Sequence, residues 1–224
     1  MTREPPNQKT RFNIREDTPT EWFETLYANA EPDGEGVPWA NMTVHPAFAK
    51  WLAQNALNGN GKSALVVGCG MGDDAVELKR LGFDVTAFDV SETAIAYCKE
   101  RFPASGIQFQ VADLLDPPVA WRRAFDFVLE IYTVQAMPPK YERELIDAIA
   151  GFTAPGGQLL VIADVAMSPR RFEDGPPWKL MPDHVDRFVD TGLTVTDRMT
   201  LPSEVTPGGA VYVTGFHRAT DDGH

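Results

Sequence analysis

The chain has 224 residues, a formal net charge of −12 and two cysteines. This length suits one α/β core better than two ordinary domains. The acidic balance argues against a nucleic-acid partner, because phosphate binding needs clustered Lys and Arg. No apolar run approaches the roughly 18 residues of a membrane span. We therefore expect a soluble, cytoplasmic protein with a small-molecule substrate, either a monomer or a dimer.

The N-terminal part divides into an arm and a helical cap. Residues 1–18 carry few large apolar side chains, which predicts a flexible arm. From Thr20, apolar residues including Trp22 and Tyr27 recur at the spacing of an amphipathic helix. A second helix is expected over 46–57. We interpret 19–60 as a cap on one domain that spans 19–224.

Strands and helices alternate strictly from residue 64, which predicts right-handed βαβ units and a parallel sheet. We expect strands at 64–67, 84–88, 107–111, 125–131 and 158–163, with helices at about 74–81, 91–102 and 142–152. An irregular insertion over 164–182, a helix over about 183–191, and strands at 193–200 and 210–217 complete the chain. A hairpin turn at 206–209 makes the last strand antiparallel. The fold class is therefore α/β, a Rossmann-like, doubly wound sheet of seven mostly parallel strands.

The first strand ends in three alternate glycines, Gly68, Gly70 and Gly72. Glycine accepts positive φ and leaves backbone amides open to a ligand at a helix N-terminus. The G-x-G-x-x-G fingerprint of dinucleotide sites would need glycine at Asp73, so a nicotinamide cofactor and an oxidoreductase fit less well. The next strand ends in Asp89, 21 positions after Gly68, where a carboxylate can accept both hydroxyls of a ribose. Each feature alone also fits an ordinary turn or helix cap, but together they favour a cofactor site.

Three short motifs, VVGCGMG at 66–72, FDVS at 88–91 and ADLL at 112–115, resemble the class I S-adenosylmethionine-dependent methyltransferases. The resemblance covers about 64–163 and implies S-adenosylmethionine as the cofactor. It implies that the glycines line the methionine and ribose portion and that Asp89 binds the ribose. It further places Val90 against the adenine face, and Asp113 with Leu114 at the adenine edge. One departure is Val66, which occupies a position that is often acidic, so the methionine ammonium needs another partner.

The strand at 125–131 is almost continuously apolar apart from Glu130. A carboxylate there either faces a site or caps the following loop. We expect Glu130 to contact the sulfonium portion of the cofactor or a cationic substrate group, and Tyr132 to border the acceptor. Neither is a certain catalytic residue; both are candidates, with His45, if the acceptor needs a base. The histidines lack metal-ligand spacing, so no metal site is expected.

Aromatic and basic residues outside the glycine motif bear on the substrate. Trp22-Phe23 and Pro38-Trp39 resemble the thiopurine S-methyltransferase and halide or thiol methyltransferase group. That resemblance implies Trp39 at the cofactor and Trp22 at the substrate, although an aromatic stripe also fits core packing. Arg170, Arg171 and Trp178 of the insertion are candidates for the acceptor pocket, with paired arginines holding an acidic group. A solvated basic loop is the alternative.

The predicted function is methyl transfer from S-adenosylmethionine to a small-molecule nucleophile by in-line displacement. A thiol, thiopurine-like or halide acceptor is favoured, because it needs no strong general base and the sequence offers no convincing one. An O- or N-methyltransferase of a small metabolite is the first alternative. A sensor that binds S-adenosylmethionine without turnover is the second.

Overall fold

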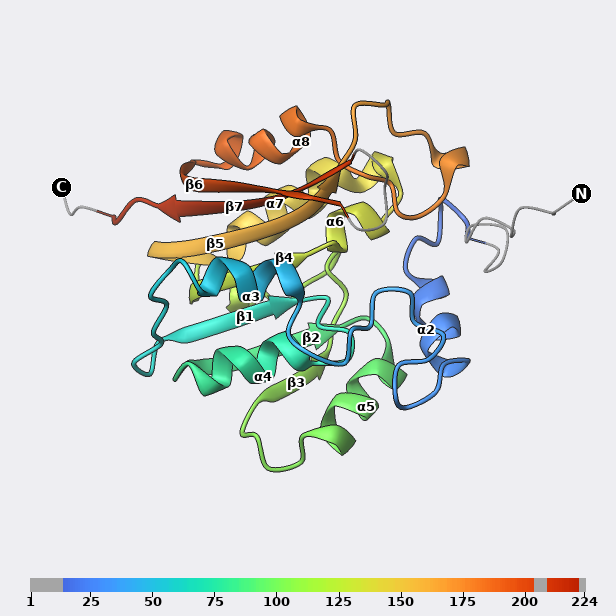
Figure 1. Cartoon of the computed structure of the whole chain (residues 1–224), viewed down its shortest axis with the longest axis horizontal. Coiled ribbons are helices and arrows are strands. Elements are labelled where there is room, and N and C mark those ends of the chain that lie inside the picture. Colours follow the sequence, from blue (N-terminus) through green and yellow to red (C-terminus); the bar gives the residue numbers. More distant parts are fainter. Residues whose placement is uncertain (1–13, 204–208, 222–224) are drawn as a thin grey trace, which may run out of the picture.

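Seven strands form one sheet in the order β3-β2-β1-β4-β5-β7-β6 in the computed structural model, which describes residues 14–203 and 209–221. The strands are β1 (Ser63–Val67), β2 (Asp84–Asp89), β3 (Gln108–Val111), β4 (Phe125–Ile131), β5 (Thr153–Val165), β6 (Leu193–Pro202) and β7 (Ala210–Arg218). Strands β1 to β5 pair in parallel, whereas β7 runs antiparallel to β5 and β6. In Figure 1 the arrow of β7 points against that of β1. The predicted fold class is confirmed.

Helices cover both faces of the sheet (Figure 1). One face packs against α3 (Pro46–Leu52), α4 (Asp73–Arg80) and α5 (Glu92–Arg101), the other against α7 (Glu142–Phe152) and α8 (Pro182–Asp186). Side chains of β1 alternate between these layers, since Leu65 and Val67 join the α7 side and Ala64 and Val66 the α3 side. A strand covered on both faces reads as a continuous apolar run, which explains its sequence.

The tips of the central strands meet at one edge of the sheet. Val67 of β1 pairs with Phe88 of β2 on one side and with Glu130 of β4 on the other. The strand order reverses between β1 and β4, and ligands of such sheets bind outside this switch point. The short helix α6 (Thr133–Ala136) begins just beyond β4 and was not predicted.

The N-terminal cap helix α2 (Glu21–Ala28) lies beyond the carboxyl edge of the sheet (Figure 1). Its Glu24 accepts hydrogen bonds from Ser91 Oγ at 2.7 Å and Thr93 Oγ1 at 2.5 Å, at the start of α5. The first thirteen residues of the predicted arm lie outside the described residues. Ile14, however, is buried, so the arm packs on the fold from there.

Several boundaries differ from the sequence prediction. Helix α3 ends at Leu52 rather than at 57. Strand β5 begins at Thr153 rather than at 158, because Thr153 pairs with Phe125 of β4 before the register of the two strands shifts. The expected helix over 183–191 divides into α8 and a 3₁₀ turn, Arg187–Thr191. Further 3₁₀ turns occur at Val119–Trp121, Pro139–Tyr141 and Phe172–Asp174. Residues 204–208, within which most of the expected hairpin turn falls, are not described. Across the described ranges, no helix has the length and apolarity that a membrane crossing needs.

Candidate active site

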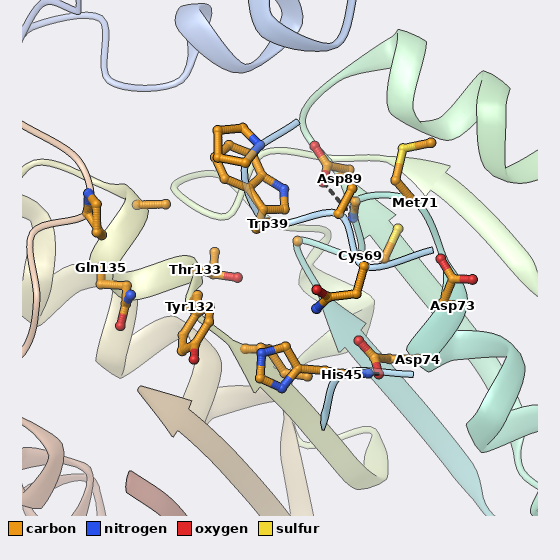
Figure 2. Close-up of a pocket in the computed structure, with 18 of the residues that line it drawn as sticks. Trp39, His45, Cys69, Met71, Asp73, Asp74, Asp89, Tyr132, Thr133 and Gln135 are labelled. Carbon is orange, nitrogen blue, oxygen red and sulfur yellow. Dashed lines mark hydrogen bonds between the residues drawn. The ribbon is translucent and has the colours of Figure 1, made fainter. Parts of the chain in front are cut away.

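A cavity of about 650 Å³ opens at the carboxyl edge of the sheet. Small-molecule sites typically enclose about 300–1,000 Å³. Ten candidate residues from the sequence line this one cavity: Trp39, His45, Gly68, Gly70, Gly72, Asp89, Val90, Asp113, Leu114 and Tyr132. Figure 2 shows Asp89, Cys69 and Met71 on one side and Tyr132 and Gln135 on the other. The structure therefore brings the predicted cofactor residues and the predicted acceptor residue together.

The glycine turn needs its bare backbone. Gly68 and Gly70 have φ values of +57° and +52°, in the left-handed region. A Cβ on Gly68 would lie 2.7 Å from Thr133 Oγ1, and one on Gly70 would lie 3.0 Å from Tyr27 Oη. Side chains here would therefore collide with the walls and narrow the cavity, so the turn has the form of a cradle for a ligand that approaches the peptide groups.

Asp89 is fixed in position by the backbone around it. Its carboxylate accepts hydrogen bonds from Gly70 N and Ser91 N, each at 3.0 Å, and burial raises its pKa to about 6 against the lowering effect of these amides. Helix α5 is capped separately by Ser91, whose Oγ accepts from Ala94 N at 3.1 Å. Ser91, and not Asp89, is therefore the residue that caps helix α5. A carboxylate oriented at the second strand tip suits the hydroxyls of a ribose.

Aromatic side chains of the N-terminal cap cover the cofactor half of the cavity. Trp39 Nε1 donates a hydrogen bond to Tyr27 Oη at 3.0 Å, and both residues line the cavity with Phe23. Trp22 does not line it, contrary to the prediction. Its ring lies 4.1 Å from that of Phe23 and 5.9 Å from that of Trp39, centroid to centroid, and its side chain is buried. Trp22 therefore packs against the aromatic residues that line the cavity and does not line it itself.

The other half of the cavity is walled by Tyr132, His45 and apolar residues of α3, β4 and the last two strands. Tyr132 has a φ of +62°, an uncommon conformation for a residue with a side chain, which turns the chain sharply after β4. The His45 ring meets Tyr132 edge-on at 5.1 Å. Burial lowers the pKa of His45 to about 4, and its Nδ1 accepts from Ala47 N at 3.3 Å. His45 is therefore neutral at pH 7, and its Nε2 carries the proton and acts as a donor.

Glu130 is not among the residues that line the cavity, so the structure does not place it where the prediction of a contact with the sulfonium or the substrate requires. Its side chain is 1 % exposed and points into the layer beneath α6, where Oε1 accepts from Val134 N at 3.1 Å. Burial raises its pKa to about 7. The alternative interpretation, a cap for the segment after β4, describes what the structure contains.

Arg170, Arg171 and Trp178 also lie outside the cavity wall, which corrects their assignment to the acceptor pocket. Arg170 is buried and forms an ion pair with Glu142, and its Nε donates to the carbonyl of Trp178 at 2.9 Å. Trp178 packs face to face with Phe172 at 5.8 Å, and Arg171 points into solvent. The insertion reaches the cavity instead through Pro176 and Pro177.

The cavity wall also contains polar residues that were not predicted from the sequence, among them Asp74, Gln135 and Asp164. Asp164 is 1 % exposed and forms an ion pair with Lys179 at 3.1 Å, while its backbone N donates to Gln135 Oε1 at 2.8 Å. Asp164 lies near the end of β5, which continues to Val165, whereas the predicted strand ended at 163. A correct strand end would have identified Asp164 as a residue expected to face the ligand. In the described part of the chain, no cluster of three His, Cys, Asp or Glu could hold a metal ion.

Comparisons with known proteins agree with this geometry. Residues 64–157 match the family model described as a methyltransferase domain. Magnesium-protoporphyrin O-methyltransferase of Rhodobacter capsulatus is 38% identical over 72 residues, which are 31% of this chain and 31% of that enzyme. The matched segment thus spans about a third of this curated relative.

Two solved structures show the same fold over most of their length. One, reported for the conversion of a disulfide bond into a thioacetal group during echinomycin biosynthesis, is 24% identical with a TM-score of 0.69 and covers 91% of this chain and 94% of that one. The other is magnesium protoporphyrin IX methyltransferase from Synechocystis PCC 6803 with bound S-adenosylmethionine. It is 15% identical with a TM-score of 0.61 and covers 77% of each chain.

The strand order and the site together define an α/β fold of the methyltransferase type. Residues 64–157 match a methyltransferase domain, and the fold is shared over most of the chain with a solved methyltransferase that binds S-adenosylmethionine. The narrower resemblance to thiopurine and halide or thiol methyltransferases has no counterpart among these matches and stays a prediction.

Proposed function

We propose that this protein transfers the methyl group of S-adenosylmethionine to a small-molecule nucleophile by in-line displacement. The observation that carries the proposal is the single cavity that joins the glycine turn and Asp89 to a second chamber around Tyr132 and His45. Such a cavity suits catalysis by proximity, because the sulfonium is already activated and the protein mainly has to align acceptor, methyl carbon and sulfur. The aromatic rings at the junction suit a positive methyl group.

The acceptor that we favour is a thiol, a thiopurine-like molecule or a halide. What supports this choice is that the bases described beside Tyr132 are engaged: His45 is neutral and its Nδ1 already accepts a hydrogen bond, and Asp164 is paired with Lys179. A soft nucleophile that reacts as an anion needs no proton acceptor in the protein. The wall residues Ala47, Ile131, Leu201 and Val211 suit an apolar molecular framework.

O- or N-methylation of a small metabolite is a second candidate. It is favoured by the local similarity to an enzyme named as an O-methyltransferase. Such an acceptor must lose a proton, and Tyr132 is the candidate to receive it or to orient the acceptor. A sensor that binds the cofactor without turnover would share the cofactor half of the site.

Calorimetry and an acceptor screen test the proposal together. We expect the protein to bind S-adenosylhomocysteine and not NADH, and to release S-adenosylhomocysteine from S-adenosylmethionine with a thiol or halide. Turnover with phenols or amines only would favour the second candidate, and binding without turnover would favour the sensor. Absence of binding to adenosyl-sulfur compounds would contradict all three.

Asp89→Asn is the variant that tests the cofactor half. Asn keeps one acceptor oxygen and loses the other, and a hydrogen bond to a charged group contributes about 1.5–3 kcal/mol, so we expect affinity for S-adenosylhomocysteine to fall roughly 10- to 150-fold. Asp84→Asn is the matched control, because Asp84 lies at the other, exposed end of the same strand. Unchanged affinity in a folded Asp89→Asn protein would refute the ribose assignment.

A further inference from the structure

We infer that Asp74 binds the ammonium group of the cofactor's methionine portion, in place of the acidic residue that this chain lacks two positions before Gly68. The inference rests on the proposed function and assigns a residue within the same site. The lacking position is Val66, which is 4 % exposed and packs in the apolar layer on the α3 side of the sheet. An ammonium in the cavity must therefore find a carboxylate elsewhere, because burying an unpaired charge is costly.

Five carboxylates line the cavity: Asp73, Asp74, Asp89, Asp113 and Asp164. Two of them already have cationic partners, and two others lie at the expected ribose and adenine positions. Asp73 forms a double hydrogen bond with Arg101 at 2.9 and 3.0 Å, and Asp164 is paired with Lys179. Asp89 accepts from two amides at the ribose position, and Asp113 accepts from Leu115 N at 2.9 Å at the expected adenine end.

Asp74 is the remaining carboxylate. Its Oδ1 accepts a hydrogen bond from His45 N at 2.8 Å, and among the described residues it makes no ion pair. The bond to the backbone of the cap anchors one carboxylate oxygen, and Asp74 lines the cavity. A cation that entered the cavity would therefore meet a carboxyl group held in position, whose ionised form the cation itself favours.

The position of Asp74 fits the tail of an adenosyl cofactor. It lies in the first turn of α4, directly after the glycine turn. Figure 2 shows Cys69 of that turn between Asp89 and Asp74. A ligand whose ribose is held at Asp89 and whose chain follows the glycine backbone thus brings its far end to Asp74. Tyr132 lies to the side of this line (Figure 2).

Binding of an ammonium group at Asp74 should be coupled to the ionisation of its carboxyl group. Burial raises the pKa of Asp74 to about 7 when no cation is bound, despite the lowering effect of the His45 amide. The facing titratable groups are Asp73 and Glu77 on α4, which raise this pKa further, and the neutral His45. A bound ammonium favours the ionised carboxylate. Binding near pH 7 should then release a proton, and affinity should rise as the pH increases from 6 to 8.

The test compares two ligands that differ in the ammonium-bearing tail. S-adenosylhomocysteine carries the amino-acid group, whereas 5′-deoxy-5′-methylthioadenosine has the same adenosyl thioether without it. We expect Asp74→Asn to weaken calorimetric binding of S-adenosylhomocysteine about 10- to 100-fold and to change binding of methylthioadenosine less than threefold. Asp84→Asn, at the exposed far end of β2 and outside the cavity wall, is the matched control and should leave both affinities unchanged.

The outcomes separate the two proposals. If the wild type binds neither ligand, the proposed function fails and the inference with it. If the wild type binds both, the inference is overturned when Asp74→Asn keeps its affinity for S-adenosylhomocysteine or loses affinity for both ligands equally. Loss of turnover at unchanged affinity would make Asp74 a general base instead, which also overturns it. Should the variant not fold, titration of the wild type in buffers of different ionisation enthalpy decides, since no proton release on binding S-adenosylhomocysteine contradicts the inference.

Discussion

At the scale of the residue, the glycine turn shows how a missing side chain shapes a site. Gly61 and Gly68 both take positive φ, +79° and +57°, so each would be strained by a side chain. Their surroundings differ, because a Cβ on Gly61 would meet nothing within 4 Å, whereas one on Gly68 would lie 2.7 Å from Thr133 Oγ1. Substitutions at these two glycines therefore distinguish the effect of backbone strain from the effect of a side chain that collides with the cavity wall.

We expect Gly61→Ala to lower the free energy of unfolding by about 1–2 kcal/mol, the cost of a left-handed residue with a Cβ, and to leave cofactor affinity unchanged. Gly68→Ala should have at least the same effect on stability and should also weaken binding of S-adenosylhomocysteine at least tenfold, since Thr133 must shift. Urea denaturation and calorimetry measure the two effects. Equal ligand affinity of the two variants would show that the turn does not form the cradle.

At the scale of the element, the segment between β5 and α8 shows why some site residues could not be predicted. Its arginines and tryptophan are residue types that often bind ligands in loops. In the structure, however, Arg170 of this segment forms an ion pair with Glu142 of α7, and the same carboxylate also pairs with His184 and Arg187. Glu142 lies on a helix that begins more than twenty residues earlier in the chain. Sequence spacing cannot show which way a loop side chain turns, because the partner that decides it is brought close only by the fold.

Replacing Glu142 by Gln should loosen this segment. The substitution leaves the buried guanidinium of Arg170 without its counter-ion, and removing one partner of a buried pair costs about 3–5 kcal/mol. We expect faster tryptic cleavage at Arg171, whose side chain is exposed, together with a lower melting temperature. Glu144→Gln, on the exposed side of the same helix, is the control. A cleavage rate equal to that of the wild type would mean that Glu142 does not anchor the segment.

Carboxyl groups with raised pKa values gather at the carboxyl edge of the whole sheet: Asp74 and Glu130 at about 7, and Asp89 at about 6. Burial is the largest cause for each. A group whose folded pKa exceeds its unfolded value contributes stability below the unfolded pKa and loses it as the pH rises through the folded pKa. Each group therefore lowers the free energy of unfolding as the pH rises through its own window, which runs from 3.8 to about 6 for Asp89, from 3.8 to about 7 for Asp74 and from 4.5 to about 7 for Glu130.

Glu130→Gln isolates one of these contributions. Relative to the wild type, the variant should gain stability as the pH rises from 4.5 to 7, by on the order of 1–3 kcal/mol, because the neutral amide is not penalised for ionising. Paired denaturant titrations at several pH values measure the difference, with the exposed Glu92→Gln as control. A difference that stays constant over this range would contradict the raised pKa of Glu130.

Across the whole molecule, the fold was more accessible to sequence reasoning than the acceptor site. Strand tips such as Gly68 and Asp89 were predictable because local conformation, spacing and chemistry all point to the same edge. Asp74 was not, since acidic residues are common in the first turn of any helix, where they complement the helix dipole. The position of Glu130 was not predictable either, because a buried carboxylate can face either layer, and only the pleat of the assembled sheet decides which.

The wall of the cavity draws on residues from Thr20 to Val211, and β7 lies between β5 and β6. Because translation proceeds from the N-terminus, a polypeptide still growing on the ribosome lacks one side of this chamber and leaves β6 without a neighbour. The side of the chamber that Val211 lines is therefore completed only after synthesis has passed the last strand and that strand has been inserted between two that were made before it.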